Sequence, residues 1–382
     1  MHTPELRQDL SVRCYSTNHA IFSTPVIDAK ENIYVGSANC YFYAINPIND
    51  TISWKFETTG VIDSAACLDT DQNIYIPSGD ASLYKLSNTG KREWVFDLLQ
   101  QNYSRFSTIY WWEGNVAIGP NEFVYAGNDD FYLYALTPDG HVQWRFPTGL
   151  QIWSVPAFNN GLVYFTSFDM CVYALDQDTG RLKWKRRLDN FIASSPAIGE
   201  DGTVYVSTFG GSIFSLDGQT GKVVWQTKTA GSMYASPAIA PDGSVFIGSG
   251  DYSVYCLEAA TGVVRWTLPV DSAVWSSMAI GSDPEKQEQY LVYVGTSGGL
   301  VMALAPNGRV RWTYRVCTQK DTQIPVINAS IALGKSGLVV ATIAGDVIYI
   351  PYDAYTRDIE RFSLGDDSPK EKVLPTDRKS VV

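Results

Sequence analysis

The feature that most constrains the fold is a repeat of about 40 residues. One unit, SSPAIGEDGTVYVSTFGGSIFSLDGQTGKVVW, spans residues 194–225, and similar units precede and follow it. Each has three short runs of alternating β-branched and aromatic residues separated by Gly, Asp and Asn, and then a fourth run around a tryptophan. This pattern is typical of a four-stranded antiparallel meander. Such a meander cannot bury both of its faces alone, so the repeat defines the whole fold.

Two markers count the units. The tryptophan of the fourth run recurs at Trp54, Trp94, Trp144, Trp184, Trp225, Trp266 and Trp312. The proline of the first run, Pro196 in the quoted unit, has equivalents at Pro25, Ala66, Val116, Pro156, Pro237, Met278 and Ile331. Eight first strands require eight units, although the last has no tryptophan. We therefore predict an all-β, eight-bladed β-propeller of four-stranded antiparallel blades.

The eighth blade lacks an obvious outer strand. Arg13 lies 12 residues before Pro25, which is the usual distance from a tryptophan to the next proline slot. Residues 10–15 (LSVRCY) are therefore well placed to supply that strand, and a ring closed by strands from both termini has no free edge there. Residues 357–363 compete for the same place, and the sequence leaves the two open. We expect one propeller domain over residues 1–362 and a polar tail over 363–382.

Composition excludes several classes of partner. The 382 residues are 45% hydrophobic, which suffices for a large core, and the formal charge is -11. A surface of this charge repels nucleic acid and anionic lipid unless a basic cluster intervenes, and we identify none. The first ten residues, MHTPELRQDL, contain no apolar segment, and no apolar run approaches the length of a membrane span. The sequence thus predicts a cytosolic protein with no nucleic-acid or membrane partner.

The cysteines do not form a recognisable framework. They are widely scattered, without CxxC or adjacent pairs, and comprise Cys14, Cys40, Cys67, Cys171, Cys256 and Cys317. This distribution favours reduced, mostly buried thiols over disulfides or a zinc site.

Two stretches carry a resemblance to a known family. SLDGQTGKVVW (residues 215–225) and ALDQDTGRLKW (174–184) resemble the tryptophan-docking motif of the PQQ-like, or quinoprotein alcohol dehydrogenase-like, eight-bladed propellers. The resemblance covers about residues 10–362. It implies that each tryptophan ring is wedged between adjacent blades. It does not specify a function, because this superfamily includes dehydrogenases, assembly scaffolds and sensor domains.

The resemblance also bears on cofactors. Quinoprotein dehydrogenases of this family have a vicinal cysteine pair over the quinone, calcium ligands, a catalytic aspartate and a longer, secreted chain. This sequence has no adjacent cysteines and no export signal, so we expect neither PQQ nor another cofactor. A second family reading, the outer-membrane assembly lipoprotein, requires a signal peptide and a lipobox cysteine, and we identify neither in this sequence.

Function is therefore sought where the repeat is broken. In a propeller, the loops between blades open on the same face as the loops between second and third strands, and we call this the top face. Two long inter-blade loops, residues 98–112 and 315–327, open there. A third insertion, residues 282–289, lies on the opposite face, and its charge predicts a solvated loop.

The repeat register predicts which side chains surround the mouth of the central channel. Three positions before the proline slot, the blades present Phe22, Asp63, Glu113, Trp153, Ala193, Tyr234, Trp275 and Asn328. The next position inward holds mostly serine, alanine and glycine, because eight inner strands converge there. The first long loop adds Tyr110, Trp111 and Trp112. We expect these aromatic and polar residues to form a ligand-binding site, although aromatic side chains can also simply plug the channel.

Asp63 and Glu113 come from neighbouring blades. Packed sheets are about 10 Å apart, so the two carboxylates can face one substrate, and repulsion with partial burial would raise one pKa toward neutrality. The pair would then supply a catalytic acid and base, whereas an isolated carboxylate would be a rim charge. His19 also belongs to the top face and is the third candidate catalytic residue. A single usable histidine excludes a multi-histidine metal site, and we expect no metal.

Aspartates between second and third strands recur with the repeat, so we interpret them as turn formers and not as calcium ligands. They are Asp80, Asp130, Asp169 and Asp251.

Two hypotheses remain. The first is a propeller that binds a small aromatic or cationic molecule in a top-face pocket and acts on it by cofactor-free acid/base chemistry, as a lyase, cyclase or hydrolase. The second is a non-catalytic scaffold whose top face binds a protein or peptide partner. The sequence leaves the choice between enzyme and scaffold open.

Overall fold

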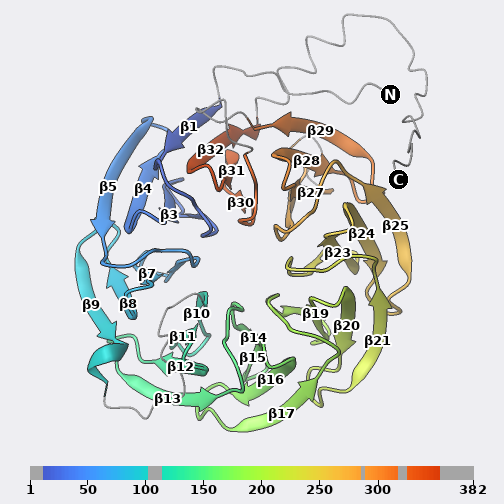
Figure 1. The fold of residues 1–382 in the computed structure, drawn as a ribbon, viewed down its shortest axis with the longest axis horizontal. Helices are drawn as coiled ribbons and strands as arrows, with labels where there is room; N and C mark the ends of the chain where they lie inside the picture. The colour runs from blue at the N-terminus through green and yellow to red at the C-terminus, as the bar shows by residue number, and fades with distance from the viewer. Residues whose placement is uncertain (1–11, 102–113, 285–288, 317–324, 353–382) are drawn as a thin grey trace, which may run out of the picture.

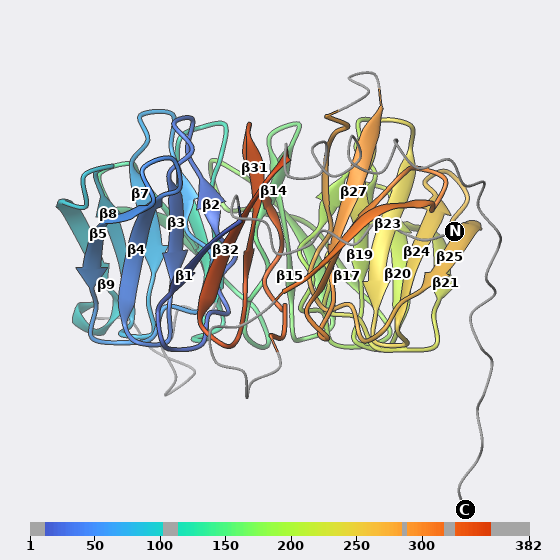
Figure 2. The same cartoon turned by 90° about the horizontal axis from the view of Figure 1, so that it is seen from above.

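Eight four-stranded antiparallel sheets surround a common axis in the computed structural model, which describes residues 12–101, 114–284, 289–316 and 325–352 (Figure 1). Figure 2 shows the ring from the side, with the strands running across its thickness. Within seven blades the strands follow chain order, each paired with the next. The predicted eight-bladed all-β propeller is confirmed.

The first four blades span residues 26–187. Blade 1 comprises β2 (Val26–Ile27), β3 (Ile33–Gly36), β4 (Tyr41–Asn46) and β5 (Thr51–Glu57). Blade 2 comprises β6 (Cys67–Leu68), β7 (Ile74–Pro77), β8 (Ser82–Leu86) and β9 (Arg92–Asp97). Blade 3 comprises β10 (Val116–Ile118), β11 (Val124–Gly127), β12 (Tyr132–Leu136) and β13 (Val142–Pro147). Blade 4 comprises β14 (Ala157–Asn159), β15 (Leu162–Ser167), β16 (Cys171–Asp176) and β17 (Leu182–Arg187).

The remaining blades complete the ring. Blade 5 comprises β18 (Ala197–Ile198), β19 (Val204–Ser207), β20 (Ser212–Leu216) and β21 (Val223–Lys228). Blade 6 comprises β22 (Ala238–Ile239), β23 (Ser244–Ser249), β24 (Ser253–Glu258) and β25 (Val264–Pro269). Blade 7 comprises β26 (Ala279–Ser282), β27 (Tyr290–Gly295), β28 (Leu300–Leu304) and β29 (Val310–Arg315). Blade 8 comprises β30 (Ala332–Leu333), β31 (Gly337–Ala341), β32 (Asp346–Pro351) and β1 (Arg13–Ser16).

The N-terminal segment supplies the outer strand of blade 8. Strand β1 pairs antiparallel with β32, with Arg13 opposite Tyr349 and Ser16 opposite Asp346 (Figure 1). The place for which residues 10–15 and 357–363 compete in the sequence is thus taken by the N-terminal strand, and residues 357–363 lie outside the described part of the chain. Strands from both ends of the chain therefore close the ring, as predicted.

Apolar residues of neighbouring blades form the core. The second and third strands are buried on both faces, as β11 and β12 illustrate, and the outer strands are partly exposed. Each apolar cluster joins two blades; one brings Tyr34 and Phe42 of blade 1 against Ile74 and Ile76 of blade 2. Burial between blades explains why a single repeat unit is not an independent folding unit.

Each docking tryptophan links its blade to the next. The indole Nε1 of Trp184 donates a 2.8 Å hydrogen bond to the carbonyl of Gly218 in blade 5. Gly221 has a φ of 66°, and a Cβ atom there would lie 2.5 Å from Cε3 of Trp184, so only glycine fits against the ring. Equivalent hydrogen bonds are made by Trp54, Trp94, Trp144, Trp225 and Trp266. The predicted wedging role is confirmed for these tryptophans.

Hydroxyl groups near the axis also join neighbouring blades. The backbone N–H of Val155 donates to Ser195 Oγ at 2.8 Å, that of Ser195 to Ser236 Oγ at 2.9 Å, and that of Ser236 to Ser277 Oγ at 2.9 Å. Small polar residues suit this layer because the inner strands converge here and their N–H groups need acceptors.

The insertion on the face opposite the top differs from its prediction. Asp283, expected in a solvated loop, is only 1% exposed and forms a 3.1 Å ion pair with Arg311. The carboxylate turns inward because the half-buried Arg311 guanidinium compensates its charge. Residues 285–288 of the insertion lie outside the described residues.

Other observations concern the thiols and the membrane. Among the five cysteines that the structure describes, Cys171 and Cys256 are buried as predicted, whereas Cys14, Cys40 and Cys67 are half-buried. In the described ranges, no helix has the length and apolar character needed to cross a membrane.

Candidate functional site

Six aromatic side chains in two groups of three form an arc on the top face over blades 4 to 7. We call them the aromatic arc: Trp153, Phe168, Phe191, Phe209, Tyr234 and Trp275. Ring centroids are 4.5 Å apart for Trp153 and Phe168, and 6.4 Å apart for Phe168 and Phe191. On the other side, Tyr234 lies 5.0 Å from Phe209 and 5.4 Å from Trp275, with both pairs edge to face. Such contacts hold the rings in defined positions.

The middle of the arc surrounds a pocket of about 280 Å³. We call it the arc pocket, and it is lined by Phe168, Phe191, Ala193, Phe209 and Tyr234. Phe191, Phe209 and Tyr234 remain 40%, 39% and 43% exposed. Clustered exposed aromatic side chains of this kind mark binding surfaces.

Two types of loop position these rings. Phe168 and Phe209 follow the second strands β15 and β19, and their backbone N–H groups donate to the carbonyls of Gln151 and Phe191 in inter-blade loops. These two hydrogen bonds tie the two types of loop together at Phe168 and at Phe209. Phe168, Phe191 and Phe209 are absent from our sequence-based candidates. The sequence does contain a signal for Phe168 and Phe209. At the equivalent repeat position other blades have a glycine, Gly79 or Gly250, so a phenylalanine there departs from the repeat.

The structure brings together part of the predicted mouth. Trp153, Ala193, Tyr234 and Trp275 belong to the arc or its pocket. Phe22 does not line this pocket, although it is 43% exposed.

Tyr110, Trp111, Trp112 and Glu113 lie outside the described residues. Their predicted role in ligand binding, and the pairing of Glu113 with Asp63, therefore remain predictions.

Asp63 has an unusual environment for a carboxylate. Its Oδ1 is buried and has no hydrogen-bond partner among the described residues, and burial raises the pKa of Asp63 above its ordinary value. Asn328 likewise has a buried Oδ1 without a partner in that part of the chain. Each side chain therefore retains an oxygen able to accept a hydrogen bond.

A second buried carboxylate was not among the sequence-based candidates. Asp129 is 4% exposed and accepts a 2.9 Å hydrogen bond from Trp153 Nε1. Burial raises the pKa of Asp129 to about 6, although the indole hydrogen bond acts in the opposite direction. Asp129 occupies the same repeat position as Phe168, so a comparison of the repeats would also have identified Asp129.

The remaining candidate, His19, is exposed in the loop before blade 1. Its backbone carbonyl accepts a hydrogen bond from Thr17 Oγ1 at 2.8 Å. No hydrogen bond from its imidazole is found within the described residues. In the same residues, no group of three or more His, Cys, Asp and Glu side chains is arranged to hold a metal ion.

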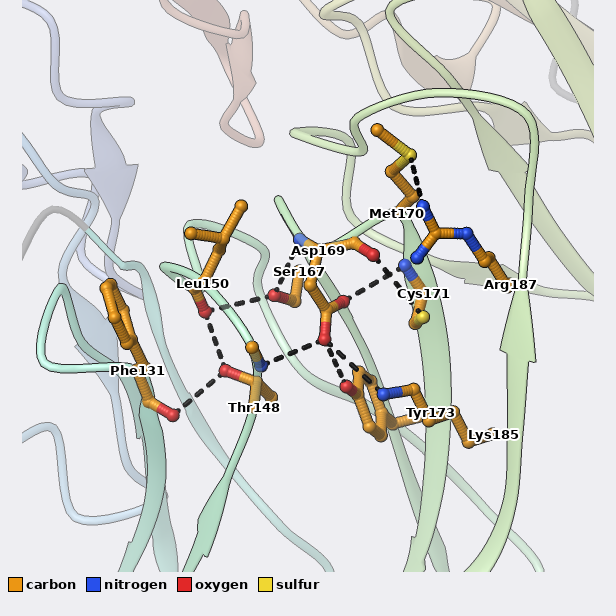
Figure 3. Close-up of polar contacts among 11 residues, drawn as sticks. Phe131, Thr148, Leu150, Ser167, Asp169, Met170, Cys171, Tyr173, Lys185 and Arg187 are labelled. Carbon is orange, nitrogen blue, oxygen red and sulfur yellow. Dashed lines mark hydrogen bonds and ion pairs between the residues drawn. The ribbon is translucent and has the colours of Figure 1, made fainter. Parts of the chain in front are cut away.

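The repeated aspartates stabilise turns and loops, as predicted. Figure 3 shows Asp169, whose carboxylate accepts hydrogen bonds from Tyr173 Oη, from the backbone N–H of Cys171 at 3.1 Å and from that of Gly149 at 2.9 Å. Lys185 Nζ lies 3.6 Å from the same carboxylate. Because Gly149 belongs to the preceding inter-blade loop, Asp169 holds two top-face loops together. Equivalent tyrosine hydrogen bonds are accepted by Asp80, Asp130 and Asp251.

Comparison with known proteins assigns the chain to a family. Residues 79–190 and 172–350 match the model of a PQQ-like family described as outer membrane protein assembly factor BamB. These matches cover more than half of the chain, which therefore belongs to the PQQ-like propeller family.

Individual relatives are more distant. The outer membrane protein assembly factor BamB of Yersinia pestis is 29% identical over 105 residues, which are 27% of this chain and about a quarter (26%) of that relative. The crystal structure of BamB from Moraxella catarrhalis has a TM-score of 0.69 at 17% identity and covers 88% of this chain and 97% of its own. The crystal structure of a computationally designed protein, Ika8, gives the same TM-score at 14% identity with the same coverage. Structural likeness at these identities shows the fold alone.

These comparisons correct the predicted location. Both the family description and the name of the Yersinia pestis relative refer to the assembly of outer membrane proteins. A cytosolic location, inferred from the absence of a recognisable export signal, is therefore wrong.

Proposed function

We propose that this protein is a non-catalytic scaffold whose top face binds a protein partner, with the arc pocket accepting an apolar side chain of that partner. The observation that carries the proposal is the cluster of three exposed aromatic rings around one pocket, namely Phe191, Phe209 and Tyr234. Aromatic side chains in a preformed depression are typical anchors of protein interfaces. The family description, which refers to an assembly factor, agrees with this function.

The chemistry of the lining favours a protein side chain over a small metabolite. Small-molecule sites usually combine apolar walls with several convergent polar groups that orient the ligand. Among the five lining residues, only Tyr234 carries a polar side-chain atom. A leucine, methionine or phenylalanine side chain needs no further polar contact, so it suits this pocket.

Selection from a random 12-residue peptide library on the purified chain tests the proposal. We expect the selected peptides to share an apolar anchor. Their affinity should fall about tenfold with Phe191→Ala or Tyr234→Ala, because each substitution removes an anchor contact. Phe22→Ala is the matched control, since Phe22 is as exposed as Tyr234 but does not line the pocket. Equal losses in all three variants, or no loss in either pocket variant, would contradict the proposal.

A second candidate function is favoured by Asp63. A carboxylate with a raised pKa and an unpartnered buried oxygen is suited to proton transfer, so acid/base chemistry on a small molecule at the mouth is the alternative. If Asp63 and Glu113 are acid and base, Asp63→Asn and Glu113→Gln should each lower turnover of a screened metabolite roughly 100-fold. Asp201→Asn, in an exposed turn of the opposite face, is the control. Turnover that survives both mouth substitutions would exclude this function.

A further inference from the structure

The outer strand of blade 4 gathers positive charge on an otherwise acidic protein. Lys183, Lys185 and Arg187 are exposed alternate residues of β17, and alternate residues of a strand share a face. Arg181, just before the strand, is also exposed. We call these four residues the basic strip. The prediction that the chain has no basic cluster is wrong, because four nearby cations are exposed together here.

Only half of these charges are compensated. Lys183 Nζ lies 3.9 Å from Asp176, and Lys185 Nζ lies 3.6 Å from Asp169. Neither Arg181 nor Arg187 has a carboxylate within ion-pair distance in the described part of the chain. The strip therefore keeps an excess of positive charge.

The basic strip extends toward the arc pocket. The Arg187 Nη2 atom lies 3.2 Å from the Met170 sulfur, as Figure 3 shows. Met170 follows Phe168 by two residues in the loop between β15 and β16, and Phe168 lines the pocket. A single bound segment can therefore reach both features.

We infer that the strip and the pocket together recognise one extended, acidic segment of a protein partner. Its carboxylates at alternate positions would lie along the strip, and an apolar side chain farther along would enter the arc pocket. The match is geometric, since alternate residues of any extended chain are about 7 Å apart, as are Lys183, Lys185 and Arg187 along β17. This inference rests on the proposed protein-binding function and specifies the chemistry of the partner.

A protein segment fits better than a nucleic acid or a lipid surface. The strip is one strand long, about 20 Å, and the whole chain, with the strip included, carries a net charge of -11. A long polyanion or an anionic membrane would meet this negative field beyond the strip, whereas a short acidic segment would not.

Three labelled peptides test the inference by fluorescence anisotropy. The first has glutamate at three alternate positions, a four-residue Gly/Ser spacer and one phenylalanine. The second has glutamine in place of glutamate, and the third has alanine in place of phenylalanine. We expect the glutamate peptide to bind about tenfold more tightly than the glutamine peptide at 50 mM NaCl, and to lose most of this advantage at 300 mM, because exposed charges are screened.

The variants separate the strip from the pocket. Arg187→Glu should remove most of the advantage of the glutamate peptide, and Arg181→Glu provides a second variant should the first unfold. Lys55→Glu is the matched control: like Lys185, Lys55 follows the docking tryptophan of its blade, and its Nζ lies over the ring of Tyr41 at 4.3 Å, as that of Lys185 lies over Tyr173 at 4.9 Å. Lys55→Glu should leave the affinities of all three peptides within twofold of those of the unsubstituted protein.

The failures are distinguishable. Equal affinity of the glutamate and glutamine peptides, or an advantage that survives both arginine variants, would overturn the inference. If Phe191→Ala still weakens binding of the glutamine peptide, the proposed protein-binding function stands although the inference about an acidic segment fails. If Phe191→Ala weakens the binding of no peptide, the proposed function fails as well. A 20-nucleotide single-stranded DNA or an anionic vesicle that binds the strip more tightly than the glutamate peptide would also overturn the inference.

Discussion

Glu31 in blade 1 accepts a 2.7 Å hydrogen bond from the backbone N–H of Lys335 in blade 8. The same carboxylate accepts hydrogen bonds from the backbone N–H and the hydroxyl of Ser336, at 3.2 and 2.8 Å. Glu31 is only 8% exposed. A side chain in the first turn of the ring therefore holds the last blade in place, beside the seam that β1 closes.

The first prediction concerns this closure. Glu31→Ala should lower the free energy of unfolding by about 2 kcal/mol, because it leaves several donors of blade 8 without their acceptor. Glu200→Ala, in the equivalent but exposed turn of blade 5, should change it by less than about 0.5 kcal/mol. Urea denaturation of both variants measures the difference. Equal effects would show that Glu31 does not hold the seam.

Substitutions at two glycines distinguish the cost of backbone strain from the cost of displacing the docking tryptophan. Gly161 and Gly221 have φ angles of 76° and 66°, but a Cβ at Gly161 meets nothing within 4 Å, whereas one at Gly221 overlaps the Trp184 ring. Gly161→Ala should cost about 1 kcal/mol, the strain of a left-handed alanine. Gly221→Ala should cost at least about 2 kcal/mol more, because the ring must move. Similar unfolding midpoints for the two variants would contradict the wedge.

Asp129 should make the free energy of unfolding depend on pH. Its pKa in the folded protein, about 6, exceeds the ordinary value of roughly 3.9, so the folded state binds the proton more tightly. Its contribution to the free energy of unfolding therefore falls as pH rises from about 4 to 6, and the cost of the buried charge is complete above that range. Asp129→Asn, which keeps an acceptor for Trp153 Nε1, should raise the thermal midpoint at pH 8 and lose most of this gain at pH 4. Asp201→Asn is the exposed control, and a gain independent of pH would refute the explanation.

Truncations test the ends of the predicted domain. Removing residues 1–16 deletes β1 and exposes the edge of β32, so the protein should unfold earlier and self-associate through the open edge. Removing residues 363–382, predicted to be a polar tail, should leave the unfolding midpoint unchanged. Size-exclusion chromatography and thermal unfolding measure both. Instability of the second truncation would extend the domain beyond residue 362.

The repeat predicts part of the mouth correctly, but other residues of the structure differ from the prediction or were not predicted. Trp153, Tyr234 and Trp275 were predicted from their register in the repeat, because strand periodicity sets which residues point to the axis. Phe191 lies five residues before its proline slot, outside the register that we considered. Asp283 was expected in solvent, yet it is buried because Arg311 of another strand pairs with it.

The sequence by itself determined the number of blades and the role of the tryptophans, since both follow from short motifs repeated at a constant spacing. It could not choose between residues 10–15 and 357–363 for the last strand, because local propensity suits either and only pairing with β32 decides. The arc pocket also required the tertiary structure. Phe168, Phe191 and Phe209 come from separate loops, and they surround one pocket only because neighbouring blades pack side by side in the ring.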